Sequence, residues 1–169
     1  MKYLIALLLT TLTTTLMAQK TYTEIIETNG TKIMKGVLSK EVLQYEPRFT
    51  WFAANELNYK PNANTVKALQ THSTIQIIAF GGTWCEDTQN ILPKFFALLT
   101  AAGFNQNQLT VLGVDRAKDT YSNLAKAMGI TNVPTFILMH NGKEIGRVIE
   151  YGKDGKWDQE IGDILTTIK

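Results

Sequence analysis

The chain has 169 residues, 44% hydrophobic and 19% charged, a composition ordinary for one globular domain that excludes a disordered or fibrous chain. The 17 basic and 15 acidic side chains leave a formal net charge of +2, and the basic residues are scattered, so no strong field attracts nucleic acid or an anionic membrane. The single cysteine, Cys85, excludes a disulfide scaffold and cannot by itself supply a thiolate zinc site.

Residues 1–18 have the features of a secretory signal peptide. Lys2 supplies a charged start, residues 3–9 form a short apolar run, and Ala18 offers a small residue for cleavage. The alternative is an uncleaved anchor, but the run is shorter than the ~20 residues that span a bilayer. We therefore expect an extracytoplasmic protein, periplasmic or secreted, that begins near Gln19, has no stable membrane association and meets an oxidising compartment.

Residues 19–70 are predicted to form an N-terminal extension, made of a hairpin and short helices. Two strand-like stretches, 21–28 and 31–38, flank Asn29-Gly30, which favours a two-residue hairpin turn. Short helices are expected at residues 39–45 and 61–70. Three aromatic residues without a clear period are expected to cover the core: Phe49, Trp51 and Phe52.

Residues 71–169 alternate strands and helices. Apolar side chains dominate residues 74–80, the pattern of a strand covered on both faces, and residues 88–102 carry apolar side chains at helical spacing. The later elements are a strand at 109–114, a helix at 120–128, strands at 135–139 and 144–150 around Asn141-Gly142, and a helix at 157–168. This order predicts an α/β fold in which helices flank a mixed central sheet.

These elements resemble the thioredoxin family in several short motifs. Phe80-Gly81-Gly82-Thr83-Trp84-Cys85 follows a buried strand and opens a helix, as the family's Trp-Cys motif does. Pro93 stands where the family has a helix-kinking proline, and residues 129–136 match its segment around a cis-proline. The resemblance covers about the last 95 residues and implies a thioredoxin-like fold for residues 71–169, preceded by the extension.

The sequence departs from that family at two positions. The family's Cys-x-x-Cys motif reads Cys85-Glu86-Asp87-Thr88 here, so a threonine replaces the second cysteine. Ala79 stands where the family buries an aspartate that manages the proton of the second cysteine. The two losses agree with each other, and they exclude dithiol–disulfide cycling within one chain.

The charges expected around Cys85 act in opposite directions. A helix N-terminus stabilises a thiolate, whereas the carboxylates of Glu86 and Asp87 oppose it. Thr88, one turn on, can donate its hydroxyl to the thiolate. Arg116 and Lys118 follow the next parallel strand, whose end should face the same sheet edge, and either could restore positive potential. The two acids have an equally good structural explanation, because acidic residues favour the first turn of any helix.

The resemblance also implies a surface that recognises substrate. Trp84 lies beside the thiol, where a ring with a polar tip forms part of the recognition surface in this family. If the bond before Pro134 is cis, the backbone of Val133 becomes available to pair with an extended peptide next to Cys85.

Three functions are compatible with these residues. The first is a monothiol thiol–disulfide oxidoreductase or isomerase, in which Cys85 forms a mixed disulfide that a thiol of the substrate or of another protein must release. The second is a thiol peroxidase, in which Cys85 becomes a sulfenic acid. The third is a non-catalytic module that binds peptides or proteins. The expected partners are protein thiols or disulfides, or an external thiol reductant, and we expect no metal, other cofactor or nucleic acid.

Overall fold

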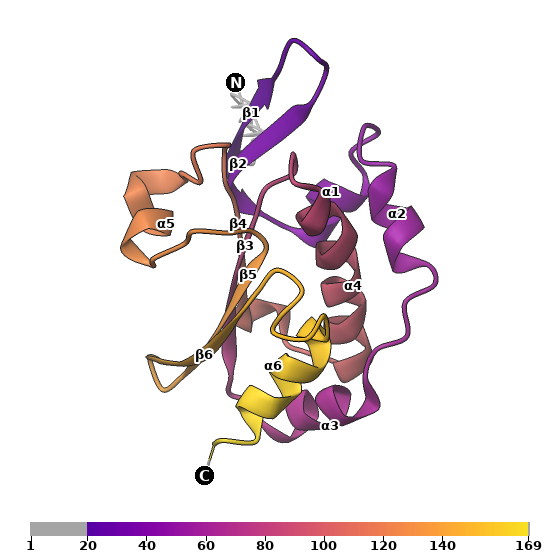
Figure 1. Cartoon of the computed structure of the whole chain (residues 1–169), viewed down its shortest axis with the longest axis vertical. Helices are drawn as coiled ribbons and strands as arrows, with labels where there is room; N and C mark the ends of the chain where they lie inside the picture. The colour runs from indigo at the N-terminus through magenta and orange to yellow at the C-terminus, as the bar shows by residue number, and fades with distance from the viewer. Residues whose placement is uncertain (1–19, 169) are drawn as a thin grey trace, which may run out of the picture.

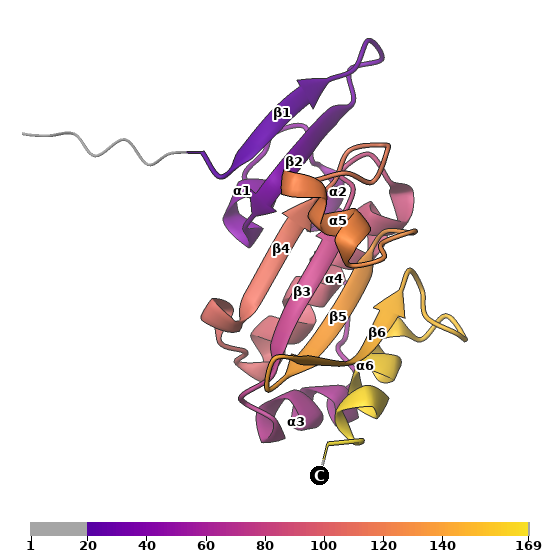
Figure 2. The same cartoon turned by 90° about the vertical axis from the view of Figure 1, so that its left-hand side faces the viewer.

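The computed structural model describes residues 20–168, so the predicted signal peptide at residues 1–18 lies outside the described residues. The described chain contains a six-stranded sheet in the order β1-β2-β4-β3-β5-β6, with helices on both faces (Figures 1 and 2). The predicted α/β fold with a mixed sheet flanked by helices is confirmed. Among residues 20–168, none of the helices combines the length and apolar character that a bilayer crossing requires.

The central strands bring three chain segments to one edge of the sheet. Strand β3 (Gln76–Gly81) runs parallel to β4 (Leu109–Gly113), with Gly81 opposite Gly113. It runs antiparallel to β5 (Thr135–His140), which continues through a tight turn into β6 (Lys143–Ile149). The carboxyl ends of β3 and β4 therefore lie beside the beginning of β5, and the loops that carry Cys85 and Pro134 meet there.

The N-terminal hairpin extends this sheet on the far side of β4. Strands β1 (Tyr22–Ile26) and β2 (Lys32–Leu38) pair antiparallel, and β2 also pairs antiparallel with β4. Because Gly36 of β2 lies opposite Gly113 at the end of β4, the earlier part of β2 continues past that end (Figure 2). The hairpin tip thus projects beyond the sheet edge that bears Cys85.

The predicted two-residue turn of this hairpin is wrong. The amide of Glu27 donates to the carbonyl of Thr31 at 2.9 Å, which leaves a three-residue loop between them. Gly30 has a φ of +85°, a conformation that glycine adopts without a steric penalty. The Asn29-Gly30 pair therefore marks the position of the turn, while the pairing of the strands determines its length.

One face of the sheet is covered by most of the helices, and the other face by a short helical segment (Figure 1). The first group comprises α1 (Lys40–Gln44), α2 (Trp51–Glu56), α3 (Ala63–Thr71), α4 (Glu86–Ala102) and α6 (Trp157–Leu165). The opposite face carries α5 (Leu124–Ala127). Two 3₁₀ turns complete the set: η1 (Gln106–Gln108) and η2 (Tyr121–Asn123). The expected helices near 39–45 and 61–70 are confirmed, and the one expected at 88–102 begins two residues earlier.

The predicted helix over residues 120–128 is wrong in length. Ser122 and Asn123 adopt left-handed conformations, with φ values of +52° and +59°, so the chain cannot wind a regular helix through them. One α-helical turn remains in α5, and Gly129 follows it in a left-handed conformation. Within α5 the buried residue is Ala125, so this short turn attaches to the sheet through one small side chain.

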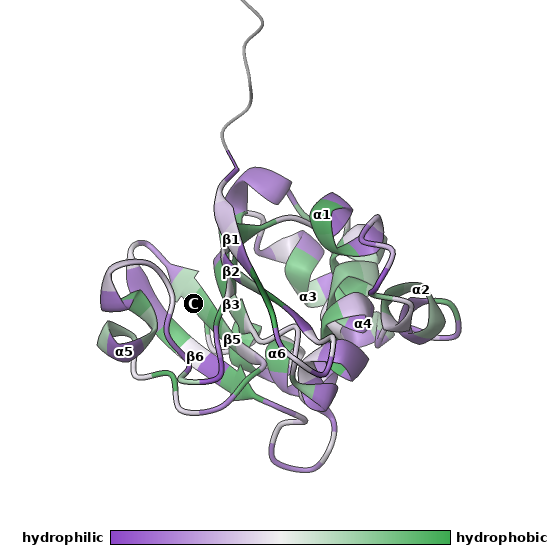
Figure 3. Cartoon of the chain, turned by 90° about the horizontal axis from the view of Figure 1, so that it is seen from above, coloured by the Kyte–Doolittle hydropathy of each residue, from purple (hydrophilic) through white to green (hydrophobic). Residues whose placement is uncertain are grey.

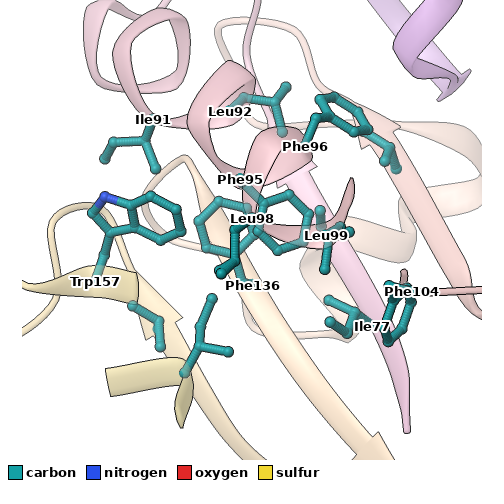
Figure 4. Close-up of a cluster of buried hydrophobic side chains, with 14 of the residues drawn as sticks. Ile77, Ile91, Leu92, Phe95, Phe96, Leu98, Leu99, Phe104, Phe136 and Trp157 are labelled. Atoms are coloured by element: carbon teal, nitrogen blue, oxygen red, sulfur yellow. The ribbon is translucent and has the colours of Figure 1, made fainter. Parts of the chain in front are cut away.

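The main core lies between the sheet and the larger helical layer. Phe95 of α4 stacks on Phe136 of β5 with ring centroids 4.3 Å apart, and Trp157 of α6 packs against both rings (Figure 4). Phe49 and Phe52 are buried in the same core, as predicted, so residues of the N-terminal extension share it. A smaller apolar cluster fills the other face beneath α5, and Figure 3 shows the central strands between helices on both sides.

Candidate functional site

Cys85 lies at the N-terminus of α4, immediately outside the first turn. Its amide donates to the carbonyl of Gly82 at 2.8 Å, which closes the tight turn between β3 and α4, and its carbonyl accepts from Gln89 inside the helix. The side chain is half-buried, so the sulfur is neither in the apolar core nor fully exposed. This position gives the thiol the positive end of a helix and access to solvent.

The proline loop, residues 128–134 before β5, lies directly against the Cys85 sulfur. The thiol of Cys85 donates to the carbonyl of Val133 with an Sγ–O distance of 3.2 Å, and the bond between Val133 and Pro134 is cis. This contact arises because β3 and β5 are neighbours in the sheet, with Phe80 opposite Thr135. The contact thereby joins a reactive atom to a backbone carbonyl 48 positions later in the chain.

The residues after Cys85 divide into exposed acids and a buried threonine. Glu86 is exposed and Asp87 half-buried in the first turn of α4, where carboxylates also stabilise the helix. Thr88 is fully buried, and its hydroxyl oxygen accepts from the amide of Gly82 at 3.2 Å. The threonine therefore anchors the loop between β3 and α4, whereas the sequence predicts that its hydroxyl donates to the thiolate.

Thr83 connects the site loop, residues 82–85 between β3 and α4, to the N-terminal hairpin. Its buried hydroxyl donates to the carbonyl of Lys32 at 2.9 Å and accepts from the amide of Met34 at 3.1 Å. Along an antiparallel ladder, residues that bond the neighbouring strand alternate with residues whose backbone groups point away from it. Lys32 and Met34 are of the second kind, so their backbone groups point away from β1. The threonine side chain thus pairs with β2 where the β4 strand has ended.

Replacing Thr83 by valine is expected to lower the free energy of unfolding by about 2 kcal/mol. The substitution keeps the shape of the side chain but leaves one buried amide and one buried carbonyl without a partner, each costing ~1–3 kcal/mol before relaxation. Urea denaturation measures the loss. Thr65→Val is the matched control, because its hydroxyl makes one short bond, to the carbonyl of Asp158 at 2.8 Å, and a long contact of 3.5 Å to Asn62 Oδ1. About half the effect is expected. Equal losses in the two variants would contradict the double role of Thr83.

Trp84 is held by contacts on its edge and on its face. The indole Nε1 donates to the carbonyl of Val114 at 3.0 Å, and the guanidinium carbon of Arg116 lies 5.1 Å from a ring centroid. Arg116 in turn makes two parallel hydrogen bonds to the carboxylate of Glu27, at 2.5 and 2.7 Å. The Arg116 guanidinium holds the pKa of Glu27 below its usual value, and Glu27 raises the pKa of Arg116.

The expected role of Arg116 is changed by this pairing. The sequence predicts that the Arg116 charge adds positive potential at Cys85, but the carboxylate of Glu27 offsets that charge. The residues around Arg116 contain further ion pairs. The Lys35 ammonium lies 2.8 Å from a carboxylate oxygen of Asp115 and 2.8 Å from one of Asp119. Burial alone would raise the pKa of Asp115, yet the Lys35 ammonium and neighbouring amides bring it below its usual value. Arg116 and Lys35 are thus both engaged with acids.

The structure brings together Trp84, Cys85, Val133 and Pro134, four of the residues singled out from the sequence. It also supplies two contacts that sequence reasoning missed, those of Thr83 and Glu27, whose partners are 49 or more residues away in the chain. Within residues 20–168, no group of three or more His, Cys, Asp or Glu side chains is arranged to hold a metal ion. The chemistry that the site can offer is that of one accessible thiol.

Comparison with known proteins agrees with this geometry. The thioredoxin family model matches residues 57–161. The chain belongs to the thioredoxin family. The match begins within the predicted N-terminal extension and contains the whole site loop, the proline loop and most of the sheet.

Relatives of this thioredoxin-family chain include two proteins of Arabidopsis thaliana. Thioredoxin H2 is 33% identical over 86 residues, which are 51% of this chain and 60% of that protein. The TPR repeat-containing thioredoxin TDX is 30% identical over 95 residues, 56% of this chain and 23% of that protein. The chain therefore covers less than two thirds of either relative.

Solved structures of thioredoxins are also similar. The oxidised form of mitochondrial thioredoxin 3 from Saccharomyces cerevisiae has 24% identity and a TM-score of 0.40, covering 56% of this chain and 83% of that one. Thioredoxin from Fasciola hepatica has 22% identity and a TM-score of 0.41, covering 61% and 89% respectively.

Proposed function

We propose that this protein is an exported thiol–disulfide oxidoreductase or isomerase of the monothiol type, which acts through a mixed disulfide at Cys85. The observation that carries the proposal is the half-buried thiol at the start of α4, 3.2 Å from the carbonyl of Val133, in a family whose motif normally has two cysteines. Export rests on the sequence of residues 1–18.

The chemistry is a thiol–disulfide exchange in two steps. The Cys85 thiolate attacks a substrate disulfide, a new sulfur–sulfur bond forms, and the other substrate sulfur leaves as a thiolate that takes up a proton. Cys85 and one substrate sulfur are then joined, and the departing sulfur has been reduced. Because Thr88 replaces the second cysteine, a thiol of the substrate or of another molecule must attack the mixed disulfide and restore Cys85.

The proposed substrate is a protein thiol or disulfide in an extended segment. Such a segment would pair with the backbone of Val133, which is buried in the free protein with its carbonyl accepting from the Cys85 thiol, so reaction at the sulfur releases that carbonyl. Trp84, the residue before Cys85, adds a half-buried ring. Slow release of the mixed disulfide suits isomerisation and substrate retention better than rapid reduction.

Intact mass spectrometry tests the reaction and the export together. The reduced protein is mixed at neutral pH with a small aromatic disulfide, with hydrogen peroxide, or with neither. We expect a mixed disulfide with the first reagent and no adduct on Cys85→Ser, since the chain has one cysteine. The mass of protein recovered from outside the cytoplasm is expected to correspond to cleavage near Ala18.

Other results of this experiment would favour one of the two alternative functions. A sulfenic acid that forms faster than the mixed disulfide would favour a thiol peroxidase. If the thiol reacts with neither reagent, the result would favour a non-catalytic binding module with a thioredoxin fold. Full-length mass in the exported fraction, or absence from it, would contradict the signal peptide.

A further inference from the structure

An ion pair joins the tip of the N-terminal hairpin to the tryptophan beside Cys85. Glu27 follows β1, and Arg116 follows β4, so 89 positions separate them in the chain. Their two hydrogen bonds, at 2.5 and 2.7 Å, engage both carboxylate oxygens. The same guanidinium lies over the Trp84 ring, so the contact continues from the hairpin to the residue preceding Cys85.

The half-buried Trp84 ring packs against the smaller apolar cluster, and three polar or backbone contacts complete its surroundings. Its edge is bonded to the carbonyl of Val114, and one face approaches Gly82, where a Cβ atom would lie 2.7 Å from the indole. The guanidinium of Arg116 is the charged group that packs on the ring. Removing that group from its place would uncover part of the ring, while the edge bond, Gly82 and the apolar cluster would hold the rest.

Arg116 needs a partner to stay over the ring. Its side chain is 50% exposed, and an exposed arginine has many rotamers of similar free energy, so entropy opposes a single position. Two parallel hydrogen bonds to a carboxylate select one orientation of the planar guanidinium. Glu27 supplies that carboxylate from a side chain that is only 24% exposed.

We propose that Glu27 is a positioning residue for substrate binding: through Arg116 it holds the Trp84 ring in the orientation presented to a peptide beside Cys85. The proposal rests on the proposed function, because it names how that site binds its substrate. The N-terminal hairpin is then part of the substrate-binding surface, and the role of the Arg116 guanidinium is to position the Trp84 ring.

The test compares a large substrate with a small reagent. Glu27→Gln is expected to slow mixed-disulfide formation with an uncharged, end-capped peptide disulfide by about two- to fivefold. Alkylation by iodoacetamide should not change, because this reagent is too small to need the ring. Arg116→Gln should slow the peptide reaction at least as much, and adding Glu27→Gln to it should have no further effect. Glu27→Asp should restore part of the rate.

Fluorescence reports the position of the ring without any reaction. The Trp84 signal is obtained as the difference between each protein and its Trp84→Phe counterpart, and acrylamide should quench it more strongly in Glu27→Gln. Glu144→Gln is the matched control, because Glu144 also forms two hydrogen bonds to an arginine, Arg147, at 2.6 Å each on β6. It should alter neither the peptide rate nor the quenching.

Three results would overturn the proposal in distinguishable ways. If the natural chain forms the peptide mixed disulfide and Glu27→Gln reacts equally fast, the positioning role is wrong and the proposed function stands. If Glu27→Gln slows iodoacetamide as much as the peptide, the variant disturbs the whole site and positioning is contradicted. If the natural chain forms no mixed disulfide, the proposed function fails, and unchanged quenching in Glu27→Gln would then reject the ring contact as well.

Discussion

Replacing Thr88 by cysteine is expected to shorten the lifetime of the Cys85 mixed disulfide by about one hundredfold. Residues 85 and 88 are one helical turn apart, with Cα atoms ~5–6 Å from each other, a separation that a disulfide can bridge. A thiol placed there attacks at an effective concentration of about 1 mM or more, against about 10 µM for an added external thiol. The lifetime is measured by following release of a fluorescent thiol from the purified mixed disulfide.

Thr88→Ser is the control for this measurement. Serine keeps the hydroxyl that accepts from the amide of Gly82 but adds no thiol, so its mixed disulfide should be as long-lived as that of the natural chain. A lifetime in Thr88→Cys equal to that in Thr88→Ser would mean that the missing cysteine does not limit release. In that case a monothiol mechanism would not follow from the motif.

Replacing Phe95 by alanine is expected to lower the free energy of unfolding by about 4 kcal/mol. Large-to-small changes at fully buried phenylalanines cost ~3–5 kcal/mol, because burial is lost and the surrounding atoms only partly fill the cavity. Phe95 is fully buried and packs against Phe136 at 4.3 Å, Phe96 at 6.2 Å and Trp157 at 6.5 Å between ring centroids. Urea denaturation followed by circular dichroism measures the change.

Leu57→Ala provides the matched surface control. Leu57 is 82% exposed, and replacement of such a side chain changes stability by no more than ~0.5 kcal/mol. A Phe95→Ala loss below about 1.5 kcal/mol would show that the aromatic cluster closes around the gap. That result would make the core between α4 and β5 looser than the ring contacts indicate.

The elements that the sequence predicts well are those whose pattern depends on burial alone. The apolar run at 74–80 predicts strand β3 because both of its faces are covered, by α4 on one side and by the cluster under α5 on the other. The spacing of apolar residues predicts α4 for the same reason. Local backbone chemistry is less predictable: the left-handed Ser122 and Asn123 interrupt the expected helix at 120–128.

The residues of the candidate site also fall into those that the sequence predicts and those that it does not. The motif around Cys85 and the proline at 134 identify the reactive thiol and its neighbouring loop from sequence, because both are local features that the family also has. The expected roles of Thr88 and Arg116 differ from their observed contacts, since each side chain forms hydrogen bonds with groups that pattern analysis does not place: the amide of Gly82 and the carboxylate of Glu27.

The sequence by itself determined that the chain has one thiol at the start of a helix and lacks the second cysteine of its family motif. Only the tertiary structure decided which groups surround that thiol. The hairpin reaches the site because β2 pairs with β4 and runs past its end, which brings Lys32 to Thr83 and Glu27 to Arg116. Contacts between residues so distant in the chain depend on strand order and register, and neither is encoded in the local pattern of either segment.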